Sequence, residues 1–155
     1  VSKSTISRFL DLLKNEGIIT VTHLKTIFRI KADMDSERYI KRKIAYNLSI
    51  AYESGLVEYV LWWLNNHGIH PKAIILFGSY RKGDDISTSD IDLAVEVSHD
   101  TDMQSSPIMD QDGRIVTLLG RKIQVHLFNR NKVDINLFNN IANGIVLYGF
   151  LEVRP

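Results

Sequence analysis

The sequence contains no cysteine among its 155 residues. Disulfide bonds and thiolate metal sites are therefore excluded, and any metal ion must be held by oxygen or imidazole ligands. With only 3 prolines and 9 glycines, the chain shows no sign of low complexity or disorder. Because 45% of the residues are hydrophobic and 24% are charged, we expect an ordinary globular protein.

Long apolar runs are also missing. No stretch approaches the roughly 18 to 20 consecutive apolar residues that would span a bilayer. The opening segment, VSKSTISRFL, lacks the apolar core of a secretion signal. These two absences predict no membrane partner and a cytoplasmic location.

Neither sign of charge dominates the chain. The formal net charge of +1 is too close to neutral to indicate a polyanionic partner from the whole molecule, so local patches have to be considered separately. A length of 155 residues suffices for one well-packed domain with a small appendage, whereas two full domains would be crowded.

The N-terminal part has the pattern of a helix followed by a hairpin. Apolar side chains recur at helical spacing between Ser4 and Asn15, which predicts an amphipathic helix that ends at Gly17. The β-branched residues that follow favour two short strands, at 18–22 and 26–31.

This pattern resembles the recognition helix and wing of a winged helix-turn-helix domain. Helices that would precede the recognition helix are not among these residues, so we assign residues 1–35 as a partial winged-helix segment. The resemblance implies DNA contacts from the early polar side chains of the helix, which are Lys3, Ser4, Thr5 and Arg8. A plain packing or oligomerisation element, as in a homo-oligomer, is an equal alternative.

Residues 36–155 form the second predicted domain, with an α/β (α+β) fold. We expect a short, mixed, twisted sheet with helices on one side. The pattern predicts helices from Ser36 and over 56–66, strands over 72–77 and 90–97, a mobile loop or frayed helix over 98–113, a short helix over 114–120, a strand over 122–128, and a closing helix with an extended tail over 133–149. Trp62 and Trp63 are expected to serve packing.

The chemistry is concentrated in residues 75–95, ILFGSYRKGDDISTSDIDLAV. Side chains alternate across a strand, so Asp90 and Asp92 should project from the same face while Ile91 and Leu93 point into the core. Two neighbouring carboxylates repel each other unless a cation lies between them. A hard divalent ion, Mg²⁺ or alternatively Mn²⁺, is therefore the predicted cofactor.

The turn before these aspartates has features of a phosphate-binding loop. Gly78 lets the backbone approach a bulky anion, and Ser79 can donate hydrogen bonds to a phosphate oxygen. Arg81 and Lys82 follow in the same turn and could neutralise a triphosphate. For this basic pair, an exposed loop without a ligand is an equally weighted alternative.

The combination of an apolar strand, Gly78-Ser79, a spacer of about ten residues and Asp90-x-Asp92 in a second apolar strand resembles minimal nucleotidyltransferases of the DNA polymerase beta-like superfamily. The segments GRKIQVHLF and NGIVLYG resemble later parts of such domains. The resemblance implies that Asp90 and Asp92 are catalytic and hold the metal. It also implies an NTP substrate, with ATP expected, whose nucleoside monophosphate is transferred to a hydroxyl group.

One position departs from the family pattern. Active members carry an additional carboxylate on a later strand, and the counterpart here is Gln124. Gln124 and His126 share one strand face, so both are candidates to line the site. His126 could act as a general base toward an acceptor hydroxyl, while a purely structural histidine is the alternative. Enzymatic activity is therefore left open.

A second hypothesis belongs to a different functional class. The chain could be a DNA-binding transcriptional regulator, or an antitoxin-like protein that binds a toxin, with a catalytically weakened nucleotidyltransferase domain. Gln124 and the N-terminal helix favour this alternative.

Overall fold

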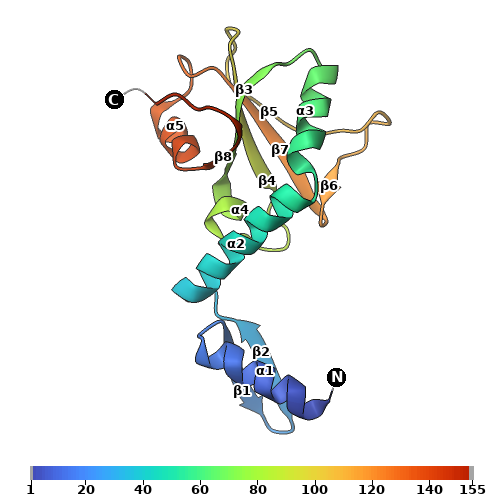
Figure 1. The fold of residues 1–155 in the computed structure, drawn as a ribbon, viewed down its shortest axis with the longest axis vertical. Coiled ribbons are helices and arrows are strands. Elements are labelled where there is room, and N and C mark those ends of the chain that lie inside the picture. The colour runs from blue at the N-terminus through green and yellow to red at the C-terminus, as the bar shows by residue number, and fades with distance from the viewer. Residues whose placement is uncertain (1, 154–155) are drawn as a thin grey trace. The chain divides into compact units, whose positions relative to one another are not determined.

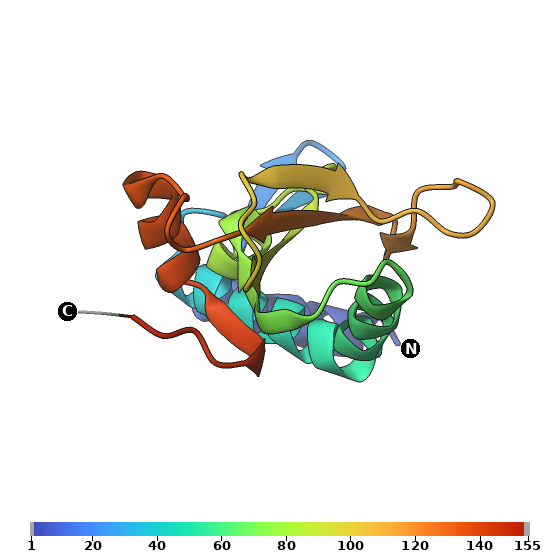
Figure 2. The same cartoon turned by 90° about the horizontal axis from the view of Figure 1, so that it is seen from above.

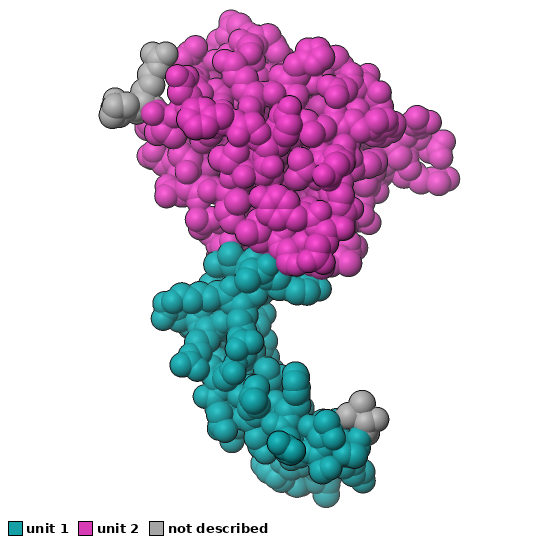
Figure 3. All heavy atoms as spheres, in the orientation of Figure 1, with its two compact units in different colours: residues 1–46 teal, residues 47–155 magenta. Residues whose placement is uncertain are grey.

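The computed structural model describes residues 2–153 (Figure 1). The chain divides between Tyr46 and Asn47 into two compact units, which Figure 3 shows in teal and magenta. This division lies within helix α2 (Glu37–Glu53). The boundary predicted from the sequence, between residues 35 and 36, stays a prediction.

The first unit contains the expected helix and hairpin. Helix α1 spans Lys3–Asn15, and the side chain of Ser2 caps it by accepting a hydrogen bond from the backbone of Thr5 at 3.2 Å. Strands β1 (Ile19–Leu24) and β2 (Ile27–Ala32) pair in antiparallel register. The predicted elements of this segment are therefore present.

Two helices precede the sheet of the second unit. The C-terminal part of α2 buries Asn47 and Ala51, and Gly55, with a φ of +70°, separates α2 from α3 (Leu56–Asn66). Helix α3 buries one stripe of side chains at helical spacing, namely Leu56, Val60 and Leu64.

The sheet of the second unit is mixed. Its strands are β3 (Pro71–Phe77), β4 (Ile91–Val97), β5 (Gln104–Pro107), β6 (Thr117–Leu118), β7 (Arg121–Phe128) and β8 (Ile145–Gly149). They lie in the order β5-β7-β4-β3-β8, with β6 paired to β7. Within residues 2–153, β4 and β7 pair in parallel, and the other pairings in this sheet are antiparallel. This arrangement confirms the predicted α+β class.

The two faces of the sheet have separate hydrophobic cores. On one face, α3 and the end of α2 pack against side chains such as Ile74 and Leu93. On the other face, helix α5 (Ile135–Ala142) packs against Ile75 and Phe77. Figure 2 shows α5 and α3 on opposite sides of the sheet. The long helices share one side as expected, but α5 covers the opposite face.

Two local predictions were wrong. Residues 104–107, expected in a loop or frayed helix, form the edge strand β5, because β7 supplies hydrogen-bond partners that the polar sequence QSSP does not reveal. The short helix expected over 114–120 is replaced by β6 and a turn in which Leu119 and Gly120 both have positive φ. The predicted extended tail is present, and it forms strand β8, which pairs with β3.

No helix within residues 2–153 is long and apolar enough to cross a membrane.

Candidate functional site

The site begins where β3 ends. Phe77 is the last residue of β3, and the short helix α4 (Gly78–Lys82) follows directly. Gly78 has a φ of +71°, and a Cβ atom at this position would overlap Oδ2 of Asp92. The Cβ and Cγ atoms of Asp92 would lie 3.2 Å from it. The backbone of the Gly78 turn therefore lies directly against the Asp92 carboxylate, so the two halves of the predicted motif meet.

Strand β4 places Asp92 on the face covered by α5. Asp92 is paired with Phe77 of β3, while its neighbours Ile91 and Leu93 are fully buried in the core on the opposite face. Asp90 immediately precedes β4 and is half-buried, as Asp92 is. The alternation predicted for Ile91, Asp92 and Leu93 is thus present.

Strand β7 brings two further side chains to the same face. Because β7 runs parallel to β4, Gln124 is in register with Asp92, so an amide occupies the neighbouring position. His126 places Nε2 3.1 Å from Oδ1 of Asp92, and its ring lies edge-on to Phe77 at 5.1 Å between centroids. His126 therefore contacts an expected metal ligand directly.

Strand β5 adds a residue that the sequence did not suggest. Ser105 pairs with His126 across β5 and β7, and its Oγ lies 2.7 Å from Nδ1 of the imidazole. When Nδ1 accepts this bond, Nε2 carries the proton and donates to Asp92. A hydrogen-bonded chain, Ser105–His126–Asp92, results. The alternation of side chains along QSSP could have indicated that Ser105 faces the site. This argument applies only once the segment is recognised as a strand.

Helix α4 contributes a half-buried cation, Arg81. Within residues 2–153, its Nε atom is buried without a hydrogen-bond partner. An unsatisfied buried N–H costs about 1–3 kcal/mol, and an anion would satisfy it. Ser79 is half-buried and its carbonyl accepts from the backbone of Gly83 at 2.9 Å, whereas Lys82 is exposed.

A buried ion pair fixes the spacer between Ser79 and Asp90. Asp85 is 1% exposed and lies 2.7 Å from the Arg121 guanidinium at the start of β7. Arg121 also donates to the carbonyls of Ile86 and Ser89, just before Asp90. These contacts tie the spacer to β7, and no local pattern indicates them because the partners lie far apart in the chain.

Asn47 of helix α2 also binds Asp85. The side-chain amide of Asn47 donates to Asp85 and to the carbonyl of Tyr80, each at 2.8 Å. Tyr80 is buried beneath the turn, at 2% exposed. The buried side chain of Asn47 therefore holds both helix α4 and the spacer in place.

The predicted DNA contacts lie on the surface of α1. Lys3, Ser4, Thr5 and Arg8 are all exposed. The hydroxyls of Ser4 and Thr5 each lie 2.8 Å from Oγ of Ser2, so they belong to the N-terminal cap of the helix. The two basic side chains are the better candidates for phosphate contacts, and DNA binding stays a prediction.

Comparison with known proteins adds a family assignment. Residues 63–150 match the family described as polymerase beta, nucleotidyltransferase. No curated protein and no solved structure matches the chain. The matched region includes the Gly78 turn, both aspartates and the β7 side chains described above. Since it covers more than half of the 155 residues, the chain belongs to the polymerase beta nucleotidyltransferase family.

Proposed function

We propose that this protein binds a nucleoside triphosphate, with ATP expected, together with Mg²⁺ or Mn²⁺, and transfers a nucleoside monophosphate to a hydroxyl group. The observation that carries the proposal is the packing of the Gly78 backbone against the Asp92 carboxylate. A loop suited to phosphate and a carboxylate suited to a metal ion therefore share one location.

The donor set fits a hard divalent ion. Asp90 and Asp92 offer carboxylate oxygens, and Gln124, in register with Asp92, can offer an amide oxygen. Within the described residues, no group of three or more acidic or histidine side chains is arranged to hold a metal. The remaining ligands would be water and phosphate oxygens, which suits Mg²⁺ because this ion keeps several waters. When bound, the ion would orient the triphosphate and stabilise developing charge.

Arg81 and Ser79 would hold the phosphates. The buried Nε of Arg81 has an unused hydrogen bond to donate, and its guanidinium is the group best matched to phosphate geometry. Ser79 adds a backbone amide and a hydroxyl beside Gly78. Exposed Lys82 would contribute charge at the outer edge of the site.

His126 would orient Asp92. Its Nε2 lies against Oδ1 of Asp92, while Oδ2 is the oxygen nearest Gly78. Because its two oxygens face different neighbours, the Asp92 carboxylate is held in one rotation. The hydrogen bond with Ser105 in turn holds the orientation of the His126 imidazole. Outer partners of metal ligands typically contribute about 10–100-fold in metal affinity or activity. We expect His126→Ala to weaken Mn²⁺ binding in that range by calorimetry, and Ser105→Ala to have a smaller effect. Equal affinity in His126→Ala and wild type would contradict this role.

Isothermal titration with ATP and Mg²⁺ tests the binding step. Asp90→Asn combined with Asp92→Asn should abolish binding. A matched control is Asp100→Asn combined with Asp102→Asn, which removes the same charge at the same spacing from exposed positions. Undiminished binding by the first double variant would refute the proposal.

Transfer is tested separately from binding. Labelled NTPs, Mg²⁺ and a cell lysate should yield a labelled macromolecule, and the Asp90/Asp92 double variant should yield none. Binding without labelling would favour a domain that only senses nucleotide.

The second candidate function is a DNA-binding regulator or antitoxin-like protein. The observation that favours it is the neutral Gln124 in register with Asp92, because no carboxylate supports Asp92 from β7. A gel shift over a range of salt concentrations tests DNA binding. Lys3→Ala and Arg8→Ala should weaken the complex and reduce its salt dependence, whereas Lys72→Ala, an exposed lysine in the other unit, should not.

A further inference from the structure

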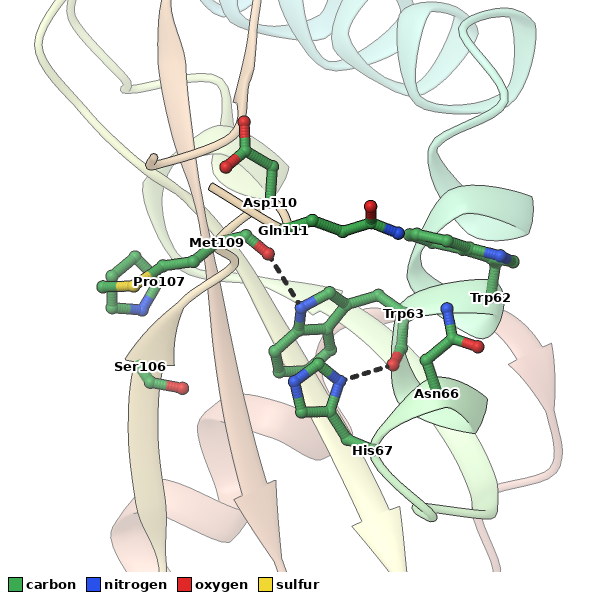
Figure 4. Close-up of a pocket in the computed structure, with 9 residues that line it drawn as sticks. All are labelled: Trp62, Trp63, Asn66, His67, Ser106, Pro107, Met109, Asp110 and Gln111. Carbon is green, nitrogen blue, oxygen red and sulfur yellow. Dashed lines mark hydrogen bonds between the residues drawn. The ribbon is translucent and has the colours of Figure 1, made fainter. Parts of the chain in front are cut away.

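A cavity lies between α3 and the segment that leads from β5 toward β6, outside the site described above (Figure 4). Its volume is about 790 Å³. It lies on the opposite sheet face from Asp92: Ser106 lines it, whereas the neighbouring Ser105 points to His126. The lining residues are Trp62, Trp63, Asn66, His67, Ser106, Pro107, Met109, Asp110 and Gln111.

One wall of the cavity is a fixed aromatic pair. The rings of Trp63 and His67 lie 4.3 Å apart between centroids with an interplanar angle of 34°. The indole N–H of Trp63 donates to the carbonyl of Met109 at 3.1 Å, and Nδ1 of His67 lies 2.8 Å from the carbonyl of Trp63. These hydrogen bonds, dashed in Figure 4, hold both rings in place without a ligand. Binding here would cost little side-chain ordering.

Trp62 offers an aromatic surface that the core does not use. The expectation that both tryptophans serve packing holds for Trp63, which contacts the core, but Trp62 is 48% exposed. Its nearest ring partner is Tyr59, at 5.7 Å between centroids. A large, half-exposed indole beside a cavity is suited to stacking against a flat ring.

Apart from Asp110, the side chains that offer polar groups to the cavity carry no fixed charge. Asn66 and Gln111 provide amide donors and acceptors, and Ser106 provides a hydroxyl. Asp110 is occupied, because its Oδ1 accepts from the backbone of Asp112 at 3.0 Å and of Arg114 at 2.8 Å. Among the described lining residues there is no lysine or arginine to attract phosphate.

We infer that this cavity binds a nucleobase that stacks on the half-exposed indole of Trp62, with its polar edge read by the Asn66 and Gln111 amides. Aromatic walls with a few neutral donors and acceptors match a flat, uncharged heterocycle that carries hydrogen-bonding groups. The base could come from a free nucleoside or from single-stranded nucleic acid, which share this chemistry. The inference does not depend on triphosphate binding at Asp90 and Asp92.

Intrinsic fluorescence tests the inference directly, because Trp62 and Trp63 are the only 2 tryptophans in the chain and both line the cavity. Adenosine, cytidine, guanosine and uridine, which lack phosphate, are titrated with correction for their own absorbance. Short single-stranded oligonucleotides form a second arm. We expect saturable quenching. Tighter binding of the oligonucleotide would identify single-stranded nucleic acid as the source, and equal affinity would identify the free base.

Variants assign the signal to the cavity. Trp62→Ala should raise the dissociation constant about tenfold, within the range for losing one base–aromatic stack, with Trp63 still reporting. Tyr52→Ala, which removes another half-exposed aromatic ring outside the cavity, should change nothing. The Asp90→Asn and Asp92→Asn double variant should keep the nucleoside response, even though it should lose ATP binding.

Three results would overturn the inference. They are the absence of saturable quenching by every nucleoside and oligonucleotide, an unchanged dissociation constant in folded Trp62→Ala, and loss of the nucleoside response in the Asp90/Asp92 double variant. Circular dichroism establishes that each variant is folded. Failure of triphosphate binding alone would refute the proposed function and leave this cavity site standing.

Discussion

Replacing Gly78 with alanine should damage both stability and ion binding, for two separable reasons. The backbone of Gly78 has a φ of +71°, and the left-handed region costs a residue with a Cβ atom about 1–2 kcal/mol. The new Cβ would also overlap Oδ2 of Asp92. Asp92 has little freedom to turn away, because His126 holds its other oxygen at 3.1 Å.

The overlap with Asp92 adds its own cost in free energy of unfolding. Either the His126 hydrogen bond is lost, at a net cost of about 0.5–1.5 kcal/mol, or the turn itself shifts. Gly78→Ala should therefore lower the free energy of unfolding by about 2–3 kcal/mol. Displacement of the Asp92 carboxylate should also weaken the binding of Mn²⁺ and ATP.

Gly113→Ala isolates the backbone effect. Gly113 has a φ of +75°, and a Cβ atom there would meet nothing within 4 Å. This variant should lose about 1–2 kcal/mol and retain ligand binding. Urea unfolding measures the first quantity in both variants, and isothermal titration measures the second. If Gly78→Ala is no more destabilising than Gly113→Ala and binds Mn²⁺ as wild type does, the packing of the turn against Asp92 has no functional role.

Further predictions concern stability, pH and metal. Arg130→Met should lower the free energy of unfolding by about 3–5 kcal/mol in thermal denaturation, because Glu96, 1% exposed and 2.6 Å from Arg130, would keep an unpaired charge; an unchanged stability would contradict this. The hydrogen bond from Lys41, and secondly the positive charge of Lys41, lower the pKa of Glu37 from its ordinary value. The pair therefore stabilises the fold above the unfolded pKa and loses its effect as pH falls through the folded pKa. NMR titration should show that Lys41→Met raises the pKa of Glu37. Chelation with EDTA should abolish ATP binding, excess Mg²⁺ should restore it, and full binding in EDTA would exclude the metal-bridged site.

Much of the architecture was predictable from local patterns. Helix α3 was predicted over 56–66 and spans Leu56–Asn66, because Gly55 and a regular apolar stripe mark it. Strands β3 and β4 were predicted to within a residue, since buried strands leave continuous apolar runs. The Gly78 turn and Asp92 meet as expected because the strands that carry them are neighbours.

The features that could not be predicted from the sequence depend on contacts between distant segments. Strand β5 is short, polar and exposed, so its identity comes from pairing with β7. Ser105 therefore could not be recognised as the partner of His126. The Asp85–Arg121 ion pair joins residues whose neighbours in sequence give no sign of burial. Likewise, helical periodicity placed Trp62 on α3 without showing that half of its surface stays exposed.

The parallel pairing of β4 with β7 has a consequence for how the family can diversify. Two parallel neighbours require a long return path, and here residues 98–120 provide it. The tip of this path, residues 110–114, is closed at its base by a bridge between Met109 and Ile115. Insertions or deletions at the tip would reshape the cavity lined by Trp62 and Trp63, while Asp92 would stay in register with Gln124. The shape of the cavity can therefore change without altering the pairing of β4 with β7 that positions Asp92.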